Sequence, residues 1–240
     1  MSITDRPVVV LVHGAFAESA SWNRVIRLLE GRGVHAVAVA NPLRGLADDA
    51  AYVRDVVDGL ARPVVLVGHS YAGLVVTQAA AGLPAVQSLV YVAAFAPETD
   101  ESALQLSGRF PGSTLADALT GYPVASGGIE FRIAEDRFHH QFCADLYADE
   151  AALMAATQRP VTERALTDGL TGEPGWRTIP SWFVFGGTDL NIPVETLRFM
   201  AERASSRGTR EVTDASHAIA ASRPDAVAAT ILDAVEGKQG

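Results

Sequence analysis

The chain has 240 residues, of which 48% are hydrophobic and 20% charged, and its formal net charge is −9. This length suits one α/β domain or two small ones with a large buried core, and the composition excludes a disordered or fibrous chain. The acidic balance argues against nucleic acid or an anionic membrane as a partner, and no apolar run is long enough to span a bilayer.

The N-terminal segment and the cysteine content indicate a cellular location. The opening residues, MSITDRP, contain neither the basic region nor the apolar stretch of a secretory signal. Cys143 is the single cysteine, which rules out an internal disulfide and suits a reducing compartment. We therefore expect a cytoplasmic protein.

The first part of the chain alternates apolar runs with helical segments. Helices are expected after Ser19 or Ser21, ending before Gly31, and over residues 46–60. The apolar runs are rich in β-branched residues, which is typical of strands buried on both faces of a parallel sheet. This alternation predicts right-handed βαβ units and an α/β fold. The runs span residues 8–12, 34–40, 64–67 and 86–95.

The alternation stops between residues 98 and 175. This stretch contains four short amphipathic pieces, and residues 122–133 are compatible with a small hairpin around Gly127 and Gly128. An insertion of this length in such a domain is typical of a lid over the site. Strands at 181–185 and 210–212 then resume the sheet, with helices at 193–204 and 224–235. We expect a core of residues 1–97 and 176–240, with a lid of residues 98–175 inserted after the fourth strand.

Residues 68–73 read GHSYAG and lie between an apolar strand and a helix of small residues. This is the G-x-S-x-G pattern of a nucleophile elbow, with alanine in the last place, and such a turn raises the serine above the sheet. Short matches occur by accident, but the strand before and the helix after are the context that the motif requires. We expect Ser70 to be a nucleophile and the Tyr71 N–H to hold an oxyanion.

A serine nucleophile needs a base and an acid, which follow it along the chain in this fold class. His217 comes just after the last strand, at the edge where parallel sheets carry their sites, and is the predicted base. Asp189 ends the preceding strand in a Gly-Gly-Thr-Asp turn and is the predicted acid. Asp214, Glu98 and Asp100 are second choices for the acid.

The loop after the first strand, HGAF at residues 13–16, is expected to supply a second oxyanion donor from the Ala15 N–H. His13 is expected to order this loop by hydrogen bonding. An apolar pocket beneath the lid is also predicted, although simple packing of the lid explains its aromatic residues equally well. Its candidate lining residues are Phe16, Phe110, Phe131, Phe138, Phe142 and Met154.

Two weaker patterns indicate no cofactor. Residues 31–36 match G-x-G-x-x-A, but they lie between a helix and a strand, whereas a dinucleotide site needs a strand and then a helix. His139, His140 and Cys143 have a loosely metal-like spacing, but no second cluster joins them. We expect neither a metal nor a cofactor.

With these motifs the chain resembles the α/β-hydrolase superfamily over nearly its full length. Within that superfamily it is similar to the plant methylesterase and hydroxynitrile lyase group and to related bacterial esterases. The resemblance implies a mainly parallel sheet of about six strands with helices on both faces and a helical lid. It also implies a Ser70–His217–Asp189 triad and an oxyanion hole formed by the N–H groups of Ala15 and Tyr71. The matching segments are residues 13–22, 68–73, 186–193 and 216–217.

The resemblance implies a serine hydrolase that cleaves a small carboxylic ester, lactone or thioester through an acyl-enzyme. Gly14 and Ala218 stand where hydroxynitrile lyases carry a threonine and a lysine, which disfavours cyanohydrin cleavage. A cofactor-free lyase, a perhydrolase and a receptor-like binding protein remain alternatives. The expected partner is a small-molecule substrate, with no nucleic acid and no membrane, and the sequence leaves a homodimer open.

Overall fold

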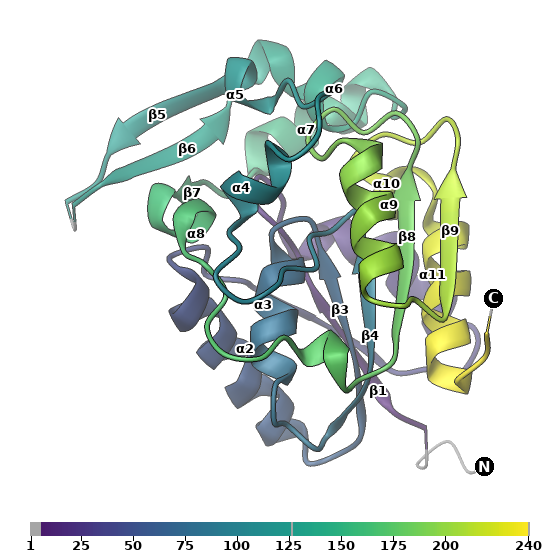
Figure 1. Ribbon diagram of the computed structural model, residues 1–240. Helices are drawn as coiled ribbons and strands as arrows, with labels where there is room; N and C mark the ends of the chain where they lie inside the picture. Colours follow the sequence, from purple (N-terminus) through teal and green to yellow (C-terminus); the bar gives the residue numbers. More distant parts are fainter. Residues whose placement is uncertain (1–5, 126, 240) are drawn as a thin grey trace.

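The structure is a computed structural model that describes residues 6–125 and 127–239 (Figure 1). Its centre is a six-stranded sheet with the order β2-β1-β3-β4-β8-β9, in which every neighbouring pair runs parallel. The α/β-hydrolase fold predicted from the sequence is thereby confirmed. The strands are β1 (Val8–Val12), β2 (Ala36–Val39), β3 (Val64–His69), β4 (Val86–Val92), β8 (Ser181–Gly186) and β9 (Gly208–Val212).

The sheet is covered on both faces. Helices α1 (Asn23–Glu30) and α11 (Pro224–Glu236) pack together on one face, and α2 (Leu46–Leu60), α3 (Ala72–Ala80) and α9 (Val194–Arg203) cover the other (Figure 1). This division follows from right-handed crossovers, because β2 lies on the opposite side of β1 from β3 and the later strands. Every residue of β1 and β3 is buried, which explains their unbroken apolar runs.

The inserted segment lies over the carboxyl ends of the strands (Figure 1). It contains strands as well as the helices expected of the lid. The hairpin predicted from the sequence is present and gains a third strand, in the antiparallel order β5-β6-β7. The elements of the lid are α4 (Ala103–Ser107), α5 (Leu115–Ala118), β5 (Leu119–Pro123), β6 (Ile129–Ile133), α6 (Glu135–Phe142), α7 (Ala148–Thr157), β7 (Val161–Thr162) and α8 (Glu163–Thr167).

Two elements of the core end differently from the prediction. Strand β4 stops at Val92, three residues early, because Ala93 adopts a left-handed φ of 43° that cannot continue a strand. Helix α1 begins at Asn23, after a short 3-10 turn, η2 (Ser19–Trp22). Ser21 does not cap α1, since its hydroxyl donates to the carbonyl oxygen of Glu18.

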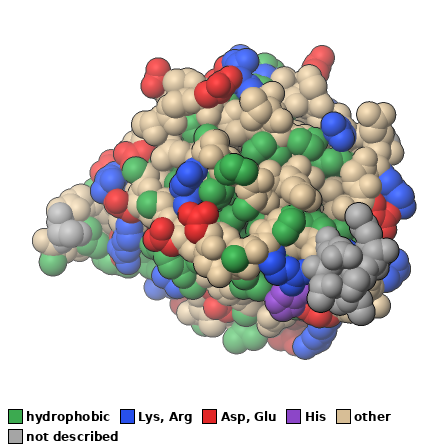
Figure 2. Space-filling view, turned by 90° about the horizontal axis from the view of Figure 1, so that it is seen from below, with side chains coloured by type: hydrophobic (Ala, Val, Ile, Leu, Met, Phe, Trp, Pro, Cys, Tyr) green, Lys and Arg blue, Asp and Glu red, His purple; other side chains and the backbone are tan. Residues whose placement is uncertain are grey.

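The face opposite the lid carries charges of both signs. Figure 2 shows Lys and Arg side chains interspersed there with Asp and Glu, and hydrophobic side chains scattered between them. Mixed charge of this kind is typical of a solvated surface. Within residues 6–125 and 127–239, no helix is both long and apolar enough to cross a membrane.

Candidate active site

Ser70 occupies a strained turn directly after β3. Its φ is 56°, in the left-handed region that a serine rarely adopts, and only 8% of the residue is exposed. Hydrogen bonds hold this conformation: the Ser70 N–H donates to Val92, and the Ser70 carbonyl oxygen accepts from Gly73 and Phe95. A Cβ atom on Gly68 would lie 2.6 Å from the carbonyl oxygen of Ala72, so the turn needs glycine there.

The structure brings Ser70, His217 and Asp189 together. The Ser70 Oγ lies 2.9 Å from the Nε2 of His217, and the Nδ1 of His217 lies 2.6 Å from the Oδ2 of Asp189. The side chains of His217 and Asp189 are fully buried. The other carboxylate oxygen of Asp189 accepts the N–H groups of Asn191 and Ile192, which fixes the carboxylate in place. This arrangement can pass the serine proton to an imidazole that a carboxylate orients.

The alternative acids lie elsewhere. Asp214 and Asp100 are exposed, and Glu98 forms an ion pair with Arg177. None of these three side chains is hydrogen-bonded to His217 within the described residues.

Two glycines let the acid and base loops approach each other. A Cβ atom on Gly186 would lie 2.0 Å from the carbonyl oxygen of Ala215, and one on Gly187 would lie 2.6 Å from that of Thr213. Thr188 then joins the loops, because its hydroxyl donates to the Ala215 carbonyl oxygen over 2.9 Å. The Gly-Gly-Thr-Asp turn is therefore what places Asp189 beside the loop that carries His217.

The loop after β1 packs against the elbow at Gly14. A Cβ atom there would lie 2.7 Å from the Ser70 Cβ and 3.2 Å from the Tyr71 nitrogen. Ala15 and Tyr71 both line the cavity beside Ser70. Neither of their N–H groups donates a hydrogen bond to any residue that the structure describes. Two such donors can hold an oxyanion.

His13 holds this loop through hydrogen bonds. The N–H of Asn41 donates to the His13 Nε2 over 3.1 Å, so Nε2 is the acceptor and Nδ1 carries the proton. That Nδ1–H donates to the Gly14 carbonyl oxygen over 2.9 Å. Burial lowers the pKa of His13 to about 4, which keeps the ring neutral.

His69 has a role that sequence reasoning did not assign. Its Nε2 lies 3.0 Å from the carbonyl oxygen of His217, and because a carbonyl only accepts, this Nε2 carries the proton. Burial is the main reason that the pKa of His69 falls to about 3. The ring sits between the edges of Trp22 and Phe142.

Asp49 is a second buried group that the sequence did not reveal. The Tyr71 hydroxyl donates to its Oδ2 over 2.8 Å, and the Arg44 N–H donates to its Oδ1 over 3.0 Å. Burial raises the pKa of both the Asp49 carboxyl and the Tyr71 hydroxyl. The side chain that follows the nucleophile is thereby anchored to α2.

A mainly apolar cavity of about 120 Å³ lies beside Ser70. A volume of this size accommodates a small group only. The polar side chains in its wall are those of Ser70, Tyr71, Ser107, Ser113 and Asn191. The remaining wall is formed by Ala15, Phe16, Phe95, Ala103, Leu104, Leu115, Ala116, Leu119, Leu166 and Ile192.

Of the six residues predicted to line this cavity, the structure places only Phe16 there. Phe138 and Phe142 are buried against each other, with ring centroids 5.0 Å apart, and Phe110 packs against Phe199. Phe131 lies in β6, and Met154 lines a separate groove. The prediction was wrong for these five because the lid aromatics fill the lid's own packing, while short aliphatic side chains face Ser70.

The end of α6 touches both loops of the site. The Nε2 of Gln141 donates to the Leu190 carbonyl oxygen over 2.9 Å and to the Asn191 side chain over 2.8 Å. The next residue, Phe142, accepts the N–H of Ala218 over 2.9 Å. Near these residues, the His139 side chain lies 2.9 Å from the Leu146 carbonyl oxygen. No group of three His, Cys, Asp or Glu residues in the described chain is placed to hold a metal ion.

Comparison with known proteins gives one matching family. The model of the Alpha/beta hydrolase family matches residues 9–230. The chain is 27% identical to Methylesterase 9 of Arabidopsis thaliana, covering 90% of this chain and 93% of that protein. It is 29% identical to the Pyrethroid hydrolase of Sphingobium wenxiniae, covering 97% and 88%. The crystal structure of polyneuridine aldehyde esterase superimposes with a TM-score of 0.81 at 20% identity, covering 95% and 98%.

Proposed function

We propose that this chain, which belongs to the alpha/beta hydrolase family and is a carboxylic ester hydrolase, cleaves small carboxylic esters through an acyl-enzyme formed on Ser70. The observation that carries the proposal is the hydrogen-bonded series from the Ser70 Oγ through His217 to Asp189. The small apolar cavity beside Ser70 supports an uncharged group of limited size on the substrate.

In the proposed mechanism, the His217 Nε2 takes the proton from the Ser70 hydroxyl while the oxygen attacks the ester carbonyl carbon. The N–H groups of Ala15 and Tyr71 hold the oxyanion, and the Asp189 carboxylate stabilises the imidazolium. His217 then gives its proton to the alkoxy oxygen, and the carbon–oxygen bond to the alcohol breaks.

Deacylation repeats these steps with water. The neutral His217 ring takes a proton from a water molecule as its oxygen attacks the acyl carbon. Collapse of the second oxyanion returns the proton to the Ser70 oxygen and releases the carboxylic acid.

Lyase chemistry on the same scaffold has less support from the residues present. Ala218 follows His217 and is buried, and its methyl group has no proton to donate. The alternatives of a lyase, a perhydrolase and a receptor-like binding protein are separated from an esterase by the fate of Ser70 and of added peroxide.

The experiment compares wild type with Ser70→Ala on short p-nitrophenyl esters and with a fluorophosphonate probe. We expect kcat/KM to fall by about 10⁴-fold or more, and the probe to label wild type alone. Ser206→Ala, in the turn before β9, is a matched control that keeps full activity and labelling. Equal hydrolysis by Ser70→Ala would rule the mechanism out. Failure of the probe to label wild type would favour a binding protein, and peroxide turnover that exceeds hydrolysis would favour a perhydrolase.

A further inference from the structure

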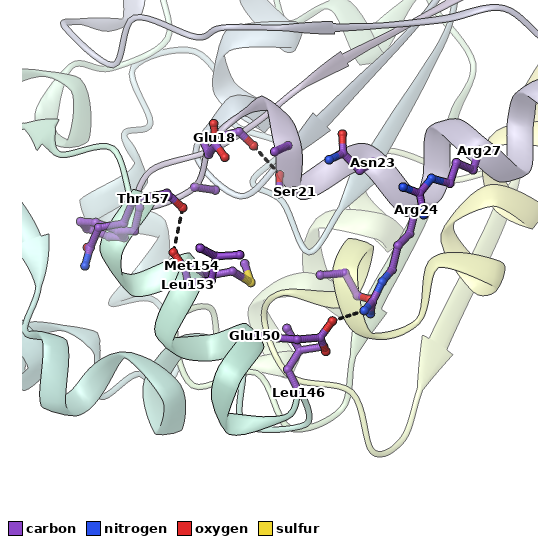
Figure 3. A pocket seen from close by; sticks show the side chains of 15 residues that line it. Glu18, Ser21, Asn23, Arg24, Arg27, Leu146, Glu150, Leu153, Met154 and Thr157 are labelled. Atoms are coloured by element: carbon purple, nitrogen blue, oxygen red, sulfur yellow. Dashed lines mark hydrogen bonds and ion pairs between the residues drawn. The ribbon is translucent and has the colours of Figure 1, made fainter.

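A second hollow lies close to the Ser70 cavity, between α7 of the lid and the segment that joins η2 to α1 (Figure 3). This groove has a volume of about 350 Å³. In Figure 3, Arg24 from α1 reaches across to Glu150 of α7 and forms an ion pair with it. Leu153 and Met154 face the same space, and Leu153 is 67% exposed.

Phe16 is the only described residue that lines both the groove and the Ser70 cavity. It is 3% exposed, and its φ of 60° lies in the left-handed region. The Phe16 N–H is held by the carbonyl oxygen of Arg159 over 3.1 Å. The backbone is therefore fixed at an unusual conformation, which sets the place of the ring between the two hollows.

The two hollows lie on different sides of the site. The wall of the groove includes Ala221, from the short helix α10 (Ile219–Ser222) just after His217. A small recess that shares Ala17, Ala221 and Met154 with the groove continues to His69. By contrast, no residue of 217–222 lines the Ser70 cavity within the described chain, and its wall instead takes residues that follow Asp189.

This division matches the two parts of an ester. The leaving alcohol receives its proton from the His217 Nε2, so it departs on the His217 side, whereas the acyl group stays on Ser70. The groove on the His217 side therefore suits the alcohol, and the closed apolar cavity suits the acyl group.

We propose that Phe16 determines specificity by separating an acyl cavity from an alcohol groove, so that its ring limits the size of the alcohol. This rests on the proposed esterase function. The acyl group is small and apolar, and the groove takes an extended, mainly apolar alcohol along Leu146, Leu153 and Met154. Arg24 and Glu150 neutralise each other at its rim, so the groove requires no charge on that alcohol.

The test compares wild type with Phe16→Ala on two series of esters. One series varies the alcohol, from methyl to octyl acetate, and the other varies the acid, from methyl acetate to methyl octanoate. In Phe16→Ala we expect the ratio of kcat/KM for octyl acetate to that for methyl acetate to rise by about tenfold or more. The corresponding ratio in the acid series is expected to change by less than about threefold.

Leu104→Ala gives the opposite control, because Leu104 lines only the acyl cavity and is 60% exposed. It should relax the acid series and leave the alcohol series as in wild type. Adding Leu153→Asp to Phe16→Ala should remove the gain with octyl acetate, since a charge then faces the octyl chain.

The proposal is wrong if Phe16→Ala leaves the alcohol ratio unchanged or relaxes the acid series instead. Phe16→Leu repeats the test with a milder truncation if the alanine variant does not fold, which its urea unfolding midpoint shows. Failure of the esterase function itself is recognised separately, by Ser70→Ala retaining wild-type hydrolysis of methyl acetate.

Discussion

The Nε2 of His69 lies 3.0 Å from the carbonyl oxygen of His217, so one buried histidine holds the backbone of another. The two rings are also in contact, with centroids 4.8 Å apart. Because burial lowers the pKa of His69 to about 3, the ring is neutral near pH 7 and its N–H stays directed at the carbonyl. His69 is a positioning residue for His217.

Replacing His69 by leucine should lower kcat by about 10- to 100-fold with little change in KM, because the loop of His217 loses a buried hydrogen bond worth about 1–3 kcal/mol. His69→Gln keeps an N–H donor and should recover part of kcat. Steady-state kinetics on p-nitrophenyl butanoate measure both variants, and His35→Leu, at an exposed histidine, is the control. Equal losses in the leucine and glutamine variants would contradict a role through the hydrogen bond.

Acid should destabilise the protein through His13 and His69. Their pKa values fall from 6.5 to about 4 and about 3 on folding, so below pH 6.5 the unfolded chain binds more protons than the native state. Stability is thus present above pH 6.5 and is lost as the pH falls toward those folded values. We expect the two groups to remove about 4 kcal/mol from the free energy of unfolding between pH 7 and pH 5.

Urea unfolding at several pH values measures this loss. His69→Gln should reduce the slope by about one proton near pH 5, whereas exposed His35→Gln should not. Asp49 acts in the opposite sense, because burial raises its pKa and the native state binds that proton first. A flat profile from pH 7 to pH 5 would mean that the buried histidines are not neutral.

Asp189→Asn should lower kcat by about 10³- to 10⁴-fold. The amide cannot offer a carboxylate to the His217 Nδ1–H, so the ring loses its orientation and the charge that stabilises the imidazolium. Asp214→Asn removes a charge from the exposed neighbour on the His217 loop and should leave kcat within about twofold of wild type. Comparable losses in both variants would show that the loop responds to any change of charge.

Gly14→Ala should impair catalysis more than folding. The new methyl group would lie 2.5 Å from the His69 carbonyl oxygen, so the loop that carries the Ala15 N–H must move away from Ser70. Loss of one oxyanion donor lowers kcat by about 10²- to 10³-fold. Gly59→Ala, in α2 with open space around the position, should retain kcat and stabilise by about 0.5–1 kcal/mol. Kinetics and unfolding midpoints of the two variants give the comparison.

The sequence predicted the sheet well because β1, β3 and β4 are buried on both faces and appear as unbroken apolar runs. It also pointed to Ser70, Asp189 and His217, which the structure brings within hydrogen-bonding distance. These residues follow strand ends, and parallel strands place such positions at one edge of a sheet.

The cavity wall was not predictable in the same way. Leu104 and Leu115 lie in helices of five and four residues, which are too short for periodicity to show which face is buried. Asp49 was an acidic residue in the first turn of a helix, and only the fold reveals that Tyr71 donates to it. Aromatic residues in the lid looked like a binding pocket because hydrophobicity alone does not distinguish packing from binding.

The contacts of Gln141 and Phe142 with the loops of Asp189 and His217 have a consequence for engineering. A chimera that replaces residues 98–175 by the equivalent segment of a relative would remove the acceptor for Ala218 and the donor to Leu190 together. Such hybrids would lose turnover even when they fold, because the transplant disturbs the loops of the base and the acid. Altering the substrate range therefore calls for single side-chain changes that leave these anchors intact.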